Sequence, residues 1–234
     1  MNLNNLFELF DIEEERRFND ELNGPEPFGA SIEENKYKKA YENFVRYYET
    51  YSGGTTRTGE NLDAIGKYNL KLEEAAIIYM YTSHGIHSDV NMQLRDNRDR
   101  LDKDIKEYCR LLNRALDKMP SFDNGIVYRD ISHPYREVSD ILDEFEQKVG
   151  DIYLEPAFIS SHIREGRWCD DEFGIQIKIF TKENSNGKDL RELSFNIEET
   201  EVLFKSSTEF LVEMVCRKNN YIELRELNPA ANMV

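Results

Sequence analysis

Hydrophobic residues recur at helical spacing through much of the first two-thirds of the chain, whereas most of the last third alternates between apolar and polar positions. This pattern predicts helices over residues 3–10, 31–51, 72–81, 101–112 and 138–149. It predicts strands over residues 125–131, 173–180, 210–215 and 221–224. Helices come first and most strands follow, which is typical of an α+β fold.

Residues 52–59, Ser-Gly-Gly-Thr-Thr-Arg-Thr-Gly, have the composition of a flexible linker. A glycine-rich loop can also bind phosphate, but no Gly-Lys-Ser or Gly-Lys-Thr follows this one. We therefore expect a boundary here. It would separate an N-terminal helical segment of unknown role, residues 1–58, from a second domain over residues 59–234.

Composition limits the classes of partner. The chain has 234 residues and a formal net charge of -16, which disfavours a surface that tracks nucleic-acid phosphates. The chain has three cysteines, Cys109, Cys169 and Cys216, which are widely spaced and form no Cys-x-x-Cys. This pattern favours reduced, buried thiols in a cytosolic chain. No signal-peptide pattern and no apolar window of membrane-spanning length occurs, so we expect a cytoplasmic protein without membrane contact. Secretion would need a dedicated export system.

Histidines offer little support for a metal site. His84 and His87 are three residues apart with a glycine between them, and no third ligand lies nearby in the sequence. Because structural zinc takes four ligands, we expect no metal.

Two carboxylates, Glu199 and Glu201, stand at the start of the apolar run Val202–Phe204. If this run is a strand, residues two apart point to the same face. Such a pair is also common on the wet face of an edge strand, so it is not specific alone. Earlier in the chain, Arg129 lies near the end of the strand predicted over 125–131, and a serine pair comes shortly after Phe158.

The order of these residues resembles the catalytic core of the Arg-Ser-Glu class of mono-ADP-ribosyltransferases, which includes the clostridial binary toxins and the arginine-specific transferases. Further upstream, the segments around Glu73-Glu74, Tyr81-Thr82 and Asn91-x-x-Leu94-Arg95 resemble the N-terminal half of the same family. The resemblance covers about residues 72–216. It implies that the N-terminal helical segment is followed by an ADP-ribosyltransferase-like β-sandwich with an NAD cleft.

The resemblance also implies a substrate and roles. NAD+ would serve as a glycosyl donor, Glu201 would stabilise the oxocarbenium-like ribose, and Glu199 would activate the nucleophile. Arg129 would bind the diphosphate, and Ser160 would brace Glu201. The cofactor-binding set would further include Tyr128 and Ser161, and acceptor recognition would involve Phe195 and Asn196.

Two positions depart from the family pattern. The serine triplet, usually Ser-Thr-Ser, reads Ser160-Ser161-His162. An aromatic residue usually lies three positions before the first glutamate, and this position is Asn196. The first departure affects how the cofactor is braced, and the second affects the choice of acceptor.

We expect a bacterial or phage toxin or effector that transfers ADP-ribose to a macromolecule, with protein arginine favoured. The alternatives are transfer to an RNA or DNA base, NAD+ glycohydrolysis with water as acceptor, and an inactive binding module. The complete set of arginine, serine and Glu-x-Glu counts against the inactive module. The acidic surface and the N-terminal helices would suit an antitoxin or chaperone as a partner.

Overall fold

A computed structural model describes residues 64–82, 86–96, 101, 103–132, 137–165, 174–194 and 200–227. These residues form two compact units, one containing residues up to Lys118 together with Glu192–Ser194, the other containing the rest. The helices predicted over 3–10 and 31–51 and the linker at 52–59 lie outside the described residues, as does the boundary at residue 58.

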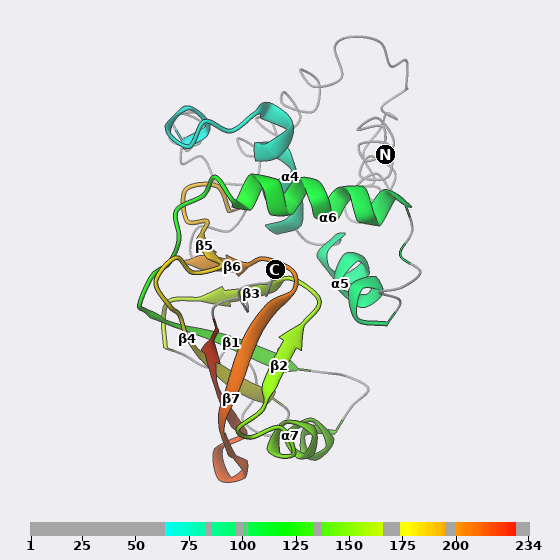
Figure 1. Cartoon of the computed structure of the whole chain (residues 1–234), viewed down its shortest axis with the longest axis vertical. Helices are drawn as coiled ribbons and strands as arrows, with labels where there is room; N and C mark the ends of the chain where they lie inside the picture. The colour runs from blue at the N-terminus through cyan, green and yellow to red at the C-terminus, as the bar shows by residue number, and fades with distance from the viewer. Residues whose placement is uncertain are drawn as a thin grey trace, which may run out of the picture. The chain divides into compact units, whose positions relative to one another are not determined.

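The first unit is helical. It contains α4 (Leu72–Thr82), α5 (Ile86–Asp96) and α6 (Lys103–Leu116), and α4 packs against α6 (Figure 1). Apolar side chains from all three helices are buried, including Ile77, Ile78, Val90, Leu112 and Leu116. The predicted helices over 72–81 and 101–112 are confirmed. The sequence pattern did not predict α5, because only Val90 and Leu94 of its described residues are buried apolar residues.

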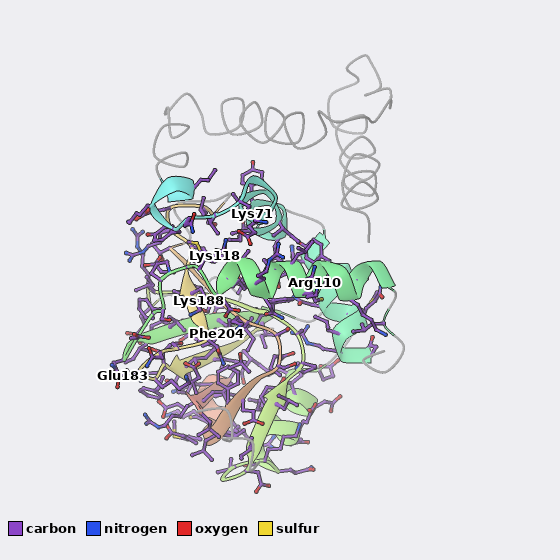
Figure 2. The ribbon with its side chains drawn as sticks, turned by 45° about the horizontal axis from the view of Figure 1, so that its top comes forward. Lys71, Arg110, Lys118, Glu183, Lys188 and Phe204 are labelled. Atoms are coloured by element: carbon purple, nitrogen blue, oxygen red, sulfur yellow. The ribbon has the colours of Figure 1, made fainter. Side chains whose placement is uncertain are left out.

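A buried carboxylate ties α4 to α6. Glu74 is 1% exposed and accepts hydrogen bonds from Lys118 Nζ at 2.6 Å and from Arg114 Nε at 3.1 Å. The backbone N–H of Lys71 donates to the same carboxylate at 2.8 Å, and Figure 2 labels Lys71 and Lys118. Burial raises the pKa of Glu74, but these hydrogen bonds and the charges of Lys118 and Arg114 outweigh it, so the pKa is lowered.

The second unit is built on one eight-stranded mixed sheet with the strand order β2-β7-β8-β4-β1-β3-β6-β5. All paired strands are antiparallel except β4 and β8. The strands are, in chain order, β1 (Ile126–Ser132), β2 (Ile152–Glu155), β3 (Ile159–His162), β4 (Gly174–Phe180), β5 (Gly187–Asp189), β6 (Glu201–Phe204), β7 (Thr208–Cys216) and β8 (Tyr221–Glu226).

Helix α7 (Val138–Glu146) contributes Ile141, Leu142 and Phe145 to the core of this sheet. The sheet side of the core comes from alternate strand positions, among them Val127, Ile177, Val202, Phe204 and Phe210. Because successive side chains of a strand point to opposite faces of the sheet, the residues between these core positions point to the other face.

The strands predicted over 125–131, 173–180, 210–215 and 221–224 are confirmed, and so is the helix over 138–149, although α7 ends earlier, at Glu146. Strands β2, β3 and β5 were missed. They have three or four residues each, and β5 is Gly-Lys-Asp. Strands of three or four residues are too short to show an alternating pattern, and they form because a neighbouring strand pairs with them.

The turn that leads into β5 is held by a second buried carboxylate. Glu226, 3% exposed, accepts hydrogen bonds from Ser185 Oγ at 2.6 Å and from the backbone N–H of Asn186 at 2.7 Å. A Cβ at Gly187 would lie 3.0 Å from the ring of Phe204, which Figure 2 labels. This glycine therefore lets β5 lie close against β6.

Two cysteines are described, and both are free thiols. Cys109 is buried, and burial raises its pKa to about 12. Cys216 is half-buried at the end of β7, so the prediction that it is buried was wrong. Cys169 lies outside the described residues. Within the described part of the chain, no helix has the length and apolar character needed to cross a membrane.

Glu74 gives a prediction for pH-dependent stability. Glu74→Gln should lower the free energy of unfolding at neutral pH by about 1–3 kcal/mol, because the charged donors lose a carboxylate. A lowered folded-state pKa contributes stability above the unfolded pKa and loses it as pH falls through the folded value. The difference from wild type, measured by urea denaturation, should therefore shrink toward about pH 3.

The matched control is Glu192→Gln, which removes the partner of Lys67 from an ion pair whose two side chains are 45–55% exposed. Exposed pairs contribute little, so this variant should unfold like the wild type at both pH values. A Glu74→Gln deficit that persists unchanged in acid would contradict the assignment of the stabilisation to the ionised carboxylate.

Candidate active site

Glu201 is the first residue of β6 and is 4% exposed. Val202 and Phe204, which alternate with it, belong to the hydrophobic core. A carboxylate at this depth needs a hydrogen-bond donor, because an unpaired buried charge is costly. The Ser160 hydroxyl supplies one, donating to Glu201 Oε1 at 2.7 Å.

The two serines of β3 have different partners. Strand β3 pairs with β6 so that Ser160 lies opposite Leu203, and Ser161 lies opposite Val202. Ser160 therefore shares a face with Glu201, whereas the buried Ser161 points the other way and donates to the carbonyl of Val202 at 2.7 Å. Ser161 thus strengthens the β3–β6 pairing, and Ser160 holds the carboxylate.

Arg129 on β1 completes a connected set. Its Nη1 donates to the backbone carbonyl of Ser160 at 2.8 Å. Because β1 pairs with β3, and β3 pairs with β6, three adjacent strands bring Arg129, Ser160 and Glu201 together. The structure therefore groups the three residues that the sequence motif singled out.

Tyr128 and His162 lie beside this set. Tyr128 of β1 and His162 of β3 are register partners, and their ring centroids are 6.3 Å apart in a stacked arrangement. Strand β3 pairs with β6 along its other edge, where the register partner of His162 is Glu201. His162 Nδ1 is 2.7 Å from the carbonyl of Arg164 and must donate to it, since a carbonyl only accepts. His162 Nε2 is 3.5 Å from Asp130 Oδ2.

The phenol of Tyr128 stays protonated in these surroundings. Burial raises its pKa, and the negative charge of Glu165 and a hydrogen bond to that carboxylate raise it further. The sequence motif named Tyr128 but not the contact between His162 and Asp130. The only sequence signal for that contact was the histidine in place of the family's third serine.

The segment before Glu201 corrects one step of the sequence argument. Thr200 has φ of +49°, in the left-handed region, and the strand begins only at Glu201. The period-two rule applies to extended backbone, so it does not extend through Thr200 to Glu199. Phe195, Asn196 and Glu199 lie outside the described residues, and their roles stay predictions.

Comparison with known proteins identifies the family. A model of the ADP-ribosyltransferase exoenzyme domain matches residues 55–227 of the chain. The chain belongs to this family. Its members use NAD+ as substrate, so the protein is an NAD+-dependent ADP-ribosyltransferase. The suspected relationship to toxin-like mono-ADP-ribosyltransferases is confirmed.

Solved structures share the α+β fold. The C3 exoenzyme of Clostridium limosum aligns with a TM-score of 0.58 at 16% identity, covering 86% of this chain and 98% of that one. ADP-ribosyltransferase HopU1 of Pseudomonas syringae aligns at 0.57 and 19% identity, covering 81% and 97%. C3stau2 from S. aureus, solved with NAD, aligns at 0.53 and 19%, covering 74% and 95%. Among curated protein sequences, none matches this chain.

The site residues have the chemistry that NAD+ requires. A guanidinium offers donors in a fork that matches diphosphate oxygens, and a carboxylate held in place suits a ribose that develops positive charge. Among the described residues, no group of three or more histidine, cysteine, aspartate or glutamate side chains is placed to hold a metal ion.

Arg129 gives a prediction for NAD+ binding. Arg129→Lys should weaken NAD+ affinity roughly tenfold, because a lysine is a point charge and cannot make a two-pronged phosphate contact. Isothermal titration of NAD+ into both proteins measures the change. The control is Arg225→Lys, which alters a two-pronged contact to Glu213 on the exposed part of β7 and β8. Equal affinities for wild type and Arg129→Lys would show that Arg129 does not bind the diphosphate.

Proposed function

We propose that this enzyme transfers ADP-ribose from NAD+ to a macromolecular acceptor, with protein arginine favoured, and that Glu201 carries the chemistry. The observation behind the proposal is the buried Glu201 carboxylate, which accepts a hydrogen bond from Ser160 while Arg129 contacts the same serine through its carbonyl.

The reaction breaks the bond between the nicotinamide nitrogen and C1′ of the ribose. Nicotinamide leaves with the bonding electron pair, so positive charge develops over C1′ and the ring oxygen. A carboxylate that is already oriented stabilises this charge without having to reorganise at the moment of reaction. In this proposal Ser160 keeps Glu201 oriented, and Arg129 holds the diphosphate of the same NAD+.

The acceptor then forms a bond to C1′ and loses a proton. An arginine side chain is protonated and is a poor nucleophile until a base removes that proton. A second carboxylate in the Glu-x-Glu pair can take it, which is the role proposed for Glu199. Phe195 and Asn196, four and three residues before Glu199, are the candidate residues for acceptor recognition.

A nucleic-acid base is the second candidate acceptor. Asn196 stands where relatives carry an aromatic residue, and an exocyclic amine of a base can react by the same route. The net charge of -16 weighs against it, since nucleic-acid affinity comes mainly from phosphate contacts with basic residues. Water as acceptor would make the enzyme an NAD+ glycohydrolase.

Glu201→Gln tests the catalytic assignment. The amide keeps the shape and can still accept the Ser160 hydrogen bond, but it removes the charge. ADP-ribose transfer should fall roughly 100-fold or more, with the melting temperature nearly unchanged. The control is Glu155→Gln, which alters another buried glutamate of the sheet, one that contacts Tyr153. Near-normal turnover by Glu201→Gln would refute the proposal.

The acceptor class can be separated in one labelling experiment. Whole lysate is incubated with NAD+ labelled in the adenylate part, and the product is divided between protease and nuclease treatment. Protein arginine as acceptor predicts label that protease releases and nuclease leaves in place. Label with the opposite sensitivity would identify a nucleic-acid acceptor, and free nicotinamide without bound label would identify hydrolysis.

A further inference from the structure

Thr200 has a backbone conformation that its side chain disfavours. Six non-glycine residues among those described have positive φ: Asn69, Asn124, Asn184, Thr200, Ser207 and Asn220. Four are asparagines, which tolerate the left-handed region because their short polar side chain bonds locally. Thr200 is the one β-branched residue among them, and β-branched residues adopt this conformation only under constraint from their surroundings.

The side chain of Thr200 adds a second local cost. Its Oγ1 is buried and has no hydrogen-bond partner. A buried hydroxyl without a partner keeps its desolvation penalty, whereas an apolar group of the same shape at the same place would have none. Valine is such a group, since it replaces the hydroxyl with a methyl.

Both costs fall on the residue between the two glutamates of the motif. The next residue is Glu201, whose carboxylate is bound to Ser160 and whose carbonyl accepts a hydrogen bond from the N–H of Leu190 at 3.0 Å. Glu201 is thus fixed at its side chain and its backbone. Departures from local preference concentrate at functional sites, where the gain comes from function and not from folding.

We propose that Thr200 is a positioning residue of this site, an inference that rests on the proposed function. Its left-handed backbone bends the chain immediately before Glu201, so that the extended backbone of β6 begins at the catalytic carboxylate. In the complex with NAD+ the Thr200 hydroxyl forms a hydrogen bond, so substrate binding removes the desolvation penalty that the hydroxyl has in the free protein.

This proposal predicts that stability and substrate binding move in opposite directions. Thr200→Val keeps the β-branched shape and removes the hydroxyl. Its melting temperature without NAD+ should exceed that of the wild type, because the unpaired hydroxyl is gone. Its KM for NAD+ should rise roughly tenfold with kcat little changed, because the lost hydrogen bond is made to bound substrate.

The backbone part is tested separately. Thr200→Gly relieves the left-handed strain and should melt no lower than the wild type, but the bend before Glu201 becomes flexible and kcat should fall roughly tenfold or more. The matched control is Asn184→Gly, which relaxes another left-handed residue, exposed in the turn after β4. It should melt no lower than the wild type and keep its kinetics.

The measurements are nicotinamide release at varied NAD+ and thermal melting with and without NAD+, all on the full chain. The pair Thr200→Ser and Thr200→Ala tests the hydroxyl independently of the β-branched shape, and only the alanine variant should show the raised KM. A Thr200→Val enzyme with wild-type kinetics would overturn the proposal and leave the function intact. A Thr200→Val protein that melts lower would show that the hydroxyl is already paired, which also overturns it. A wild-type protein without nicotinamide release and without an NAD+-dependent rise in melting temperature would overturn both proposals.

Discussion

The hydrogen bond from the Ser160 hydroxyl to the Glu201 carboxylate joins two residues that are 41 positions apart in the chain. A buried carboxylate is tolerated only where donors replace water, so β6 can begin with a glutamate only if β3 lies beside it in this register. The register in turn depends on Ser161, whose hydroxyl bonds the Val202 carbonyl on the opposite face. The carboxylate and the strand pairing thus stabilise each other.

Three buried glutamates, Glu74, Glu201 and Glu226, meet the same need for hydrogen-bond donors in different parts of the fold. Glu74 accepts hydrogen bonds from the charged side chains of Lys118 and Arg114. Glu226 accepts them from the Ser185 hydroxyl and the backbone N–H of Asn186. Each of these two carboxylates joins segments that are 40 to 44 positions apart in the chain. Glu201 also joins distant segments through Ser160, and it is the buried glutamate to which the proposed function assigns the reaction.

The parts of the fold that the sequence predicted are those whose apolar periodicity spans two or more turns or a full alternating strand. The α6 and β4 segments are examples, because their apolar positions repeat over fourteen and seven residues. Strand β3 carries two serines and a histidine in four residues, so nothing in its pattern separates it from a loop. Its conformation comes from pairing with β1 and β6.

The motif located Arg129, Ser160 and Glu201 because chain order is visible in a sequence. The direction of each side chain depends on φ. A threonine gives no sign of the positive φ that Thr200 adopts, so the sequence could not predict it.

The two halves of the reaction depend on different kinds of structure. In the proposed function, NAD+ is held by fixed charges at fixed distances. Arg129, Ser160 and Glu201 come from three adjacent strands whose hydrogen-bonded register sets their spacing. Sites on strands hold their geometry better than sites on loops, which suits a step whose transition state tolerates little displacement. The proposed acceptor residues all precede Thr200, where the strand has ended. A left-handed residue at that junction separates the two parts, because the pleat of β6 no longer dictates the direction of the chain before it. Under the proposed function, changes in acceptor preference can therefore accumulate before Thr200 without disturbing the strands that carry Arg129, Ser160 and Glu201.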